Sequence, residues 1–508
     1  MQDISVNSVL FFLAIIFFSV SSVYGGVADV LRNQDTKNAQ QQEITTTKEV
    51  NKNDSTEQTP SGDVKKSLEN HPLDEYIQKA EQGDALVQEV LGDFYKRGYM
   101  VPQNDQEAFK WYKKAAEQDR AAAQFNIGVM YDNGEGVEQN YQEAIKWFSK
   151  AAEQGSADAQ SMLGFKYRFG EGVEQNSQEA FKLYKKAAEQ GDLFAQSTLG
   201  EMYFIGEGVE QNNQEGLKWY TEAAKQGNFF AQYELGYKYY NGEGVAQNYQ
   251  DAFKWFRKAA EHDNDIIVAT AQYNNALLYL GVMYSNGEGV TQNSQEAFKW
   301  YKKLAEQGNA GAQFNIGLMY RKGEGVAQND QEAFKWYKKA AEQGDVDAQF
   351  NIGLMYSKGE GVEQNYQEAF KWFKKAAKQG NATAQFNIGF MYSNGEGVEQ
   401  NKHEALKWYK KAAEQGHVGA QFGLGQMYDN GKGVEQNYQE AFKWYKKAAE
   451  QGNATAQLNL GYSYSKGEGV EQNKIMAYEW WLKAARQGNE NAQKNLDMLC
   501  THSSWACK

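Results

Sequence analysis

A glycine that recurs at a fixed interval constrains this chain more than any other feature. It lies in a short apolar segment and returns every 36 residues, with one interval of 45. It occupies positions Gly92, Gly128, Gly164, Gly200, Gly236, Gly281, Gly317, Gly353, Gly389, Gly425 and Gly461. Such a period is typical of stacked arrays of small units, which lengthen by adding units. Function is therefore expected to depend on a surface.

The segment from Ala121 to Gly155 illustrates one unit. Ala123, Ile127 and Met130 fall at helical spacing and predict a first helix, called helix A, which ends at Gly134. The recurring glycine lies in the middle of helix A, where glycine costs about 1 kcal/mol relative to alanine. Its repetition predicts a close approach of the small residues of the second helix, Ala144 or Ala151 in this unit.

The second helix, helix B, is predicted to begin at Asn140. Glu143 lies three residues further on, as in a capping box, and Gly155 ends the helix. A tryptophan recurs with Trp147, and Leu183 alone breaks that column. We expect it to form a core or inter-unit ridge. The recurring lysines of helix B are expected on a solvated convex face. In the preceding unit they are Lys110, Lys113 and Lys114.

The regions outside the repeats have their own patterns. Residues 1–26 contain the apolar run Val9 to Val20 and are expected to be a signal peptide, although Asp3 replaces the usual basic residues. An uncleaved anchor is the alternative. Residues 27–70 are polar and predict a disordered linker. The array is expected over residues 71–499, with half-unit caps, and residues 500–508 form a tail whose Cys500 and Cys507 are either disulfide-linked or separate.

One interval contains nine extra residues near residues 263–275. They predict either a longer helix A or an inserted turn, with a local kink. Only three prolines occur in 508 residues, as long helices require. The net charge of −13 argues against nucleic acid or an anionic membrane as the main partner.

The repeated pattern resembles the Sel-1-like repeat family, relatives of the tetratricopeptide repeats. In one unit it reads AQFNIGVMYDNGEGVEQNYQEAIKWFSKAAEQG. The resemblance implies an all-α, right-handed α/α solenoid of about eleven helix-turn-helix repeats, with scaffold or adaptor roles. Cysteine-rich bacterial members resemble penicillin-binding proteins with weak β-lactamase activity. They carry cysteine pairs within their repeats, which this chain lacks, so a hydrolase of that type is only an alternative.

No catalytic or metal-binding motif is found. The five histidines do not pair at ligand spacing, and neither a G-x-S-x-G elbow nor a P-loop occurs. We therefore expect no catalytic residues, no metal and no cofactor. The leading hypothesis is an exported, non-enzymatic adaptor in the periplasm, cell envelope or medium, or in the endoplasmic reticulum lumen if eukaryotic. A structural spacer is a further alternative, and the oligomeric state stays open.

Variation between units indicates where partners could bind. In the solenoids that the resemblance implies, helix A lines the concave face, and its positions after the glycine and after the tyrosine vary. The units from Ala159 to about Gly244 add aromatic residues there. The predicted site for a protein or peptide is Phe165, Phe169, Phe204, Ile205, Tyr237 and Tyr240. Packing between units, or against the insertion, is the alternative role.

Overall fold

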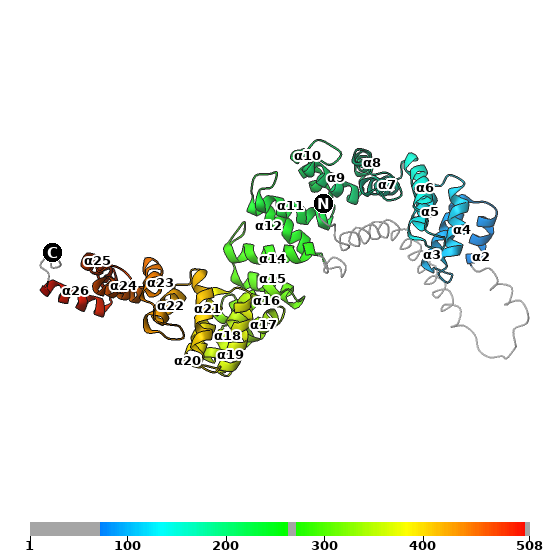
Figure 1. The fold of residues 1–508 in the computed structure, drawn as a ribbon. Coiled ribbons are helices and arrows are strands. Elements are labelled where there is room, and N and C mark those ends of the chain that lie inside the picture. The colour runs from blue at the N-terminus through cyan, green and yellow to red at the C-terminus, as the bar shows by residue number, and fades with distance from the viewer. Residues whose placement is uncertain (1–71, 263–270, 503–508) are drawn as a thin grey trace, which may run out of the picture. The chain divides into compact units, whose positions relative to one another are not determined.

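The computed structural model describes residues 72–262 and 271–502. Within these residues it contains 24 helices and no strand, as predicted (Figure 1). The chain divides into two compact units, residues 1–276 and residues 277–508. The predicted signal peptide, the predicted linker and Cys507 lie outside the described residues, so those predictions stay open.

In the first unit the helices follow one another as pairs of helix A and helix B. The unpaired α2 precedes them and α14 (Ala271–Asn286) follows. The helices are α2 (Pro72–Glu81), α3 (Ala85–Arg97), α4 (Asp105–Ala116), α5 (Ala121–Asn133), α6 (Tyr141–Glu153), α7 (Ala157–Phe169), α8 (Ser177–Glu189), α9 (Leu193–Ile205), α10 (Asn213–Lys225), α11 (Phe229–Asn241) and α12 (Tyr249–Ala260).

The second unit repeats this arrangement. Helix α14, in which the boundary between the units falls, is a helix A, and α15 is the helix B that follows it. The helices are α15 (Ser294–Glu306), α16 (Ala310–Lys322), α17 (Asp330–Glu342), α18 (Val346–Lys358), α19 (Tyr366–Lys378), α20 (Ala382–Asn394), α21 (Lys402–Glu414), α22 (Val418–Asn430), α23 (Tyr438–Glu450), α24 (Ala454–Lys466), α25 (Lys474–Arg486) and α26 (Glu490–His502).

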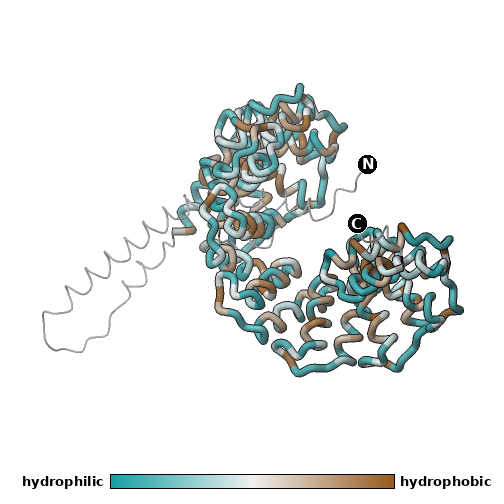
Figure 2. Tube along the Cα trace, turned by 90° about the vertical axis from the view of Figure 1, so that its left-hand side faces the viewer, coloured by the Kyte–Doolittle hydropathy of each residue, from teal (hydrophilic) through white to brown (hydrophobic). Residues whose placement is uncertain are grey.

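From α3 to α11 and from α16 to α24, each helix A packs most extensively against its own helix B, and next against the preceding helix B. Figure 2 shows hydrophobic segments recurring along these helices. The half-unit caps are confirmed: α2 is a helix B without a described helix A, and α26 is a helix A without a described helix B. In α26, Asp497 takes the place of the recurring glycine, and no described helix B packs there to require a small residue.

Asparagine begins helix B and glycine ends helix A, as predicted. The side chain of Asn140 accepts hydrogen bonds from the backbone N–H groups of Gln142 and Glu143, both at 3.1 Å. Gly134 adopts the left-handed conformation, φ 73°, that glycine tolerates best. The reciprocal half of the predicted capping box is replaced, because the Glu143 carboxylate instead pairs with Lys146.

The mid-helix glycine lies closest to an aromatic ring of helix B, which the expectation of small residues did not include. A Cβ atom at Gly128 would lie 2.5 Å from Cδ1 of Phe148. The same position of helix B is Tyr112 beneath Gly92 and Phe373 beneath Gly353. A small residue of helix B also comes close: a Cβ atom at Gly200 would lie 3.2 Å from the carbonyl oxygen of Gly216, which stands at the position of Ala144. The bare backbone of the recurring glycine therefore lets helix B pack closely against helix A.

The tryptophan column forms the predicted inter-unit ridge. Trp372 of α19 is 8% exposed and joins a core cluster with Tyr337 of α17 and Met355 of α18. Each such cluster combines one helix B, the next helix A and the tryptophan of the next helix B. Lysines cover the outer side of this column: Lys375 Nζ lies 3.8 Å from the centre of the Trp372 ring.

Buried glutamines link the pairs. Gln124 donates a hydrogen bond from Nε2 to the carbonyl oxygen of Ala116, and Gln154 Nε2 donates to Gln124 Oε1 at 2.8 Å. The pattern recurs in both units and is interrupted at the 45-residue interval. There His262 takes the place of the second glutamine, beside Gln232, and Leu277 takes the place of the first glutamine in the next repeat. Here α14 has 16 residues against 13 in α11, so helix A is longer by three residues, and the choice between a longer helix and an inserted turn with a kink stays open for the other extra residues. Residues 263–270 lie outside the described residues.

Candidate binding cavity

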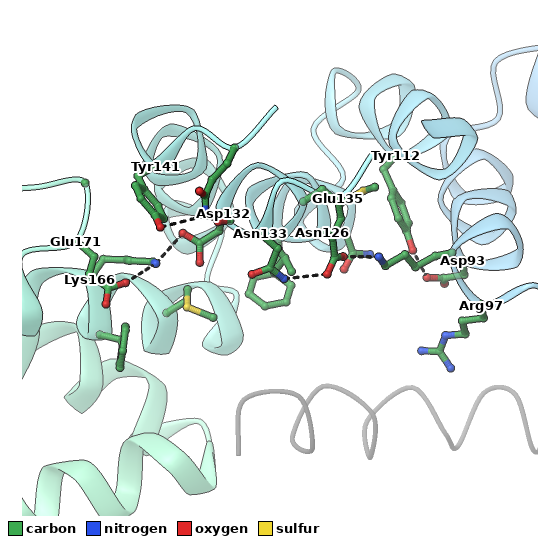
Figure 3. A pocket seen from close by; sticks show the side chains of 18 of the residues that line it. Asp93, Arg97, Tyr112, Asn126, Asp132, Asn133, Glu135, Tyr141, Lys166 and Glu171 are labelled. Carbon is green, nitrogen blue, oxygen red and sulfur yellow. Dashed lines mark hydrogen bonds and ion pairs between the residues drawn. The ribbon is translucent and has the colours of Figure 1, made fainter. Parts of the chain in front are cut away.

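A cavity of about 610 Å³ opens on the helix A side of the first unit (Figure 3). Three successive helices A, α3, α5 and α7, supply most of its lining together with the loops that follow α5 and α7, and Tyr112 of α4 and Tyr141 of α6 complete it. Its apolar wall consists of Phe125, Val129, Met130, Met162 and Phe165. Phe125 is 2% exposed and rests on Phe148, so the wall is held by the core.

A buried ionic cluster closes one end of the cavity. Lys166, only 3% exposed, pairs with Asp132 of the preceding helix A at 2.6 Å and with Glu171 at 2.8 Å. Burial raises the pKa of Asp132, and the ammonium of Lys166 opposes that shift. Figure 3 shows Lys166 between these two carboxylates, beside Tyr141.

A second ionic cluster lies toward the other end. Lys96 of α3 bridges Asp105, at 3.0 Å, and Glu135. The hydroxyl of Tyr112 donates a hydrogen bond of 2.6 Å to Asp93, whose pKa is raised above its ordinary value mainly by burial. The cavity therefore offers an apolar wall between two groups of charged residues, which is the usual composition of a ligand site.

Sequence reasoning missed this cavity, although a signal for it was present. The position two residues after the recurring glycine is methionine in seven of the 36-residue repeats, and Met130 is 1% exposed there. Lys166 and Lys238 interrupt that methionine column. A charged residue in an otherwise apolar core column needs a partner, and Lys166 finds its partners in the wall of the cavity.

The six residues of the predicted aromatic site differ in their exposure and in the residues that they contact. Phe165 is 4% exposed and Phe204 is 8% exposed, so both are core residues. Phe204 stacks on Tyr220 at 5.6 Å between ring centres. Ile205 is 60% exposed, whereas Phe169, Tyr237 and Tyr240 are partly buried. Packing between units accounts for Phe165 and Phe204, and only Phe165 lines the cavity.

Buried charges continue along the helix A side beyond the cavity. Arg168 of α7 pairs with Glu201 of α9 at 2.9 Å and with Glu207 at 2.8 Å. In α11, burial raises the pKa of Glu234 to about 7, and Lys238 opposes this shift. Glu234 makes no ion pair within the described part of the chain. The predicted aromatic patch is thus a row of aromatic rings interleaved with buried charges.

The described lining of the cavity carries carboxylates, cations, amides and tyrosine hydroxyls as its polar groups. It contains no serine, cysteine or histidine. Over residues 72–262 and 271–502 no group of three or more acidic, histidine or cysteine side chains could hold a metal ion. In those same ranges none of the helices is both long and apolar enough to cross a membrane.

The fold and the cavity define a helical-repeat protein of the α/α solenoid class. The chain belongs to the Sel1 repeat family, as the resemblance predicted. The Sel1 repeat model matches eleven segments: residues 86–119, 121–156, 157–192, 193–228, 230–264, 274–309, 310–345, 346–381, 382–417, 418–453 and 454–489.

Two solved structures are similar at the level of sequence. A protective antigen present in uropathogenic Escherichia coli strains, displaying an SLR fold, is 38% identical. The match covers 84% of this chain and 90% of that one, with a TM-score of 0.73. A Sel1 repeat protein from Oxalobacter formigenes is 34% identical, with 66% and 93% covered and a TM-score of 0.52. Comparison with curated proteins gave no match.

Proposed function

We propose that this protein is an exported, non-enzymatic adaptor that binds a protein or peptide partner in the cavity of its first unit. The observation that carries the proposal is the cavity itself. Its lining spans three successive helices A, two of which, α5 and α7, supply the apolar wall, and ion pairs fix Lys96 and Lys166 at its two ends. Repeat solenoids commonly present such extended surfaces to partners.

Export is proposed from the leader. The apolar run from Val9 to Val20 has the length of a signal-peptide core and is short for a membrane span. The similar Escherichia coli protein is described as a protective antigen, which supports a place outside the cytoplasm. N-terminal sequencing of the protein from culture medium and envelope fractions tests this. A start near Gly25 or Ala28 is expected, and an intact Met1 in the cytoplasmic fraction contradicts export.

Site-specific crosslinking tests the cavity. A photoreactive amino acid replaces Asn126, which lines the cavity, in the full chain expressed in its native host. The matched control is Asn387, which lies two residues before the recurring glycine of its own unit, as Asn126 does. Crosslinked peptides specific to position 126 are expected by mass spectrometry. Equal products at both positions, or none at position 126, contradict binding in the cavity.

Two other functions have distinct outcomes. A hydrolase of the penicillin-binding or β-lactamase type would turn over nitrocefin, whereas the adaptor would leave it intact. A structural spacer would give no crosslinked partner at position 126 and would keep its role when Val129 is replaced by glutamate. The described cavity lining, which lacks serine, cysteine and histidine, favours the adaptor over the hydrolase.

A further inference from the structure

The charges around the cavity are unequal. Its lining includes four acidic residues, Asp93, Asp132, Glu135 and Glu171, and three basic residues, Lys96, Arg97 and Lys166. Lys96 and Lys166 are each shared between two carboxylates. These two ammonium groups are thus already neutralised, and an anionic ligand would have to displace a carboxylate from each of them.

Asp93 is the carboxylate that these pairs leave over. Its one hydrogen bond comes from the neutral hydroxyl of Tyr112, and it makes no ion pair within the described part of the chain. The guanidinium of Arg97 is close enough to lower the pKa of Asp93, but burial outweighs it and the net shift is upward. A partly buried carboxylate in this state gains from an added cation.

The surroundings of Asp93 define what should accompany that cation. Figure 3 places Asp93 and Tyr112 at one end of the cavity and Asn126 between them and Asp132. The Asn126 amide makes no hydrogen bond within the described residues, so it can both donate to and accept from a ligand. Beyond it lies the apolar wall with Val129 and Met162.

From this arrangement we infer that the cavity takes a peptide segment in which a basic side chain, lysine or arginine, neighbours an apolar side chain. The basic group pairs with Asp93, the apolar group contacts Val129 and Met162, and the amide of Asn126 bonds the peptide main chain. This inference rests on the proposed function, because it specifies the partner of the same cavity. Charge complementarity selects a basic segment over an acidic one.

The probe is a phage-displayed library of random heptapeptides selected on the full chain. Phage that bind the Val129→Glu variant are discarded, because that variant places a charge in the apolar wall. Asn126→Trp, which fills the cavity from a partly exposed position, serves as a second counter-selection if Val129→Glu lowers the melting temperature. Synthetic peptides of the selected sequence are then titrated by fluorescence anisotropy.

The decisive variant is Asp93→Asn, which keeps the shape of the side chain and an acceptor for Tyr112 but removes its charge. Asp429→Asn is the matched control, because Asp429 accepts a hydrogen bond from Tyr445 in the second unit, away from the cavity. We expect selected peptides to carry lysine or arginine beside an apolar residue. Asp93→Asn should weaken their binding roughly tenfold or more, and Asp429→Asn should leave it unchanged.

Two other results separate the hypotheses. Cavity-specific peptides without a basic residue, or peptides that bind Asp93→Asn as well as the unaltered chain, would overturn the basic-segment inference and leave the adaptor function standing. If no peptide distinguishes the unaltered chain from both cavity variants, peptide binding in this cavity is refuted, and the inference with it.

Discussion

The ring of Phe148 lies on the backbone of Gly128, at a distance that leaves no room for a β-carbon. The same relationship joins Gly317 to Tyr337 and Gly425 to Tyr445. It explains why a helix-weakening residue recurs in the centre of helix A. The recurring glycine is therefore a packing residue, and its position marks where one pair of helices closes.

Replacing Gly128 by alanine is expected to lower stability. The added methyl group would lie 2.5 Å from the Phe148 ring, and overpacking of this kind costs about 1–3 kcal/mol, part of which the better helix propensity of alanine offsets. We expect a net loss of roughly 1–2 kcal/mol in urea unfolding. Gly311→Ala is the control: a Cβ atom there would meet only Asn309 Oδ1, at 3.5 Å, which is an ordinary contact, so the change should be neutral or stabilising.

Lys166→Met restores the methionine column but is expected to destabilise the chain. It leaves Asp132, 11% exposed at its side chain, without its ion-pair partner. Loss of one partner of a buried pair costs about 3 kcal/mol or more. Serine stands at the position of Asp132 in several other units. The double variant Lys166→Met, Asp132→Ser should therefore recover most of that loss, and equal stability of the single and double variants would contradict a buried ion pair.

The Glu234 carboxyl is expected to make stability fall as pH rises. Its pKa in the folded chain is about 7, above the ordinary value of 4.5, because burial disfavours its charged form. Its contribution is complete below pH 4.5 and is lost as pH rises through about 7, a total of about 3 kcal/mol. Glu234→Gln should lack this dependence. Thermal melts from pH 4 to 8 compare it with a control, Glu210→Gln, at an exposed loop residue.

Substitutions of Phe204 and Ile205, two residues of the predicted aromatic site, are expected to lower the free energy of unfolding by very different amounts. Phe204→Ser removes a ring that is 8% exposed, so we expect a loss of about 3 kcal/mol or more. Ile205→Ser alters a side chain that is 60% exposed and should change stability by less than about 0.5 kcal/mol. Ile205 is thus the clean test of binding by this site. Unchanged partner crosslinking in Ile205→Ser, with no loss of stability, would argue against its role.

Periodicity predicted the fold because every 36-residue repeat packs its helices with the same residue types at the same positions. Asn140 and Gly134 mark the helix ends in the sequence because helix capping depends on residues only a few positions apart. The partner of Gly128 was not predictable in this way. Both a ring and a small side chain can accompany a bare backbone, and the choice depends on which face of helix B turns inward.

The cavity was harder to predict because its residues come from three different 36-residue repeats. Asp132 and Lys166 are 34 positions apart, and each looks like an ordinary surface residue in isolation. Aromatic content drew attention to Phe204 and Tyr240, but apolar rings in a solenoid are needed first for its core. The break of the methionine column at Lys166 was the more informative signal, since burying an ammonium requires a specific neighbour.

The buried glutamines have a consequence for how such a gene changes. Gln124 and Gln154 satisfy each other within a segment that recurs almost unchanged, and Gln160 and Gln190 do the same in the next. Recombination between neighbouring repeats would delete or duplicate one whole segment and leave every buried amide paired. At Leu277 that glutamine is absent, so duplication of the segment that contains it would copy a repeat without this amide pair. Changes in the number of whole repeats on either side of Leu277 therefore preserve the amide pairs, whereas copies of the repeat that contains Leu277 lack one.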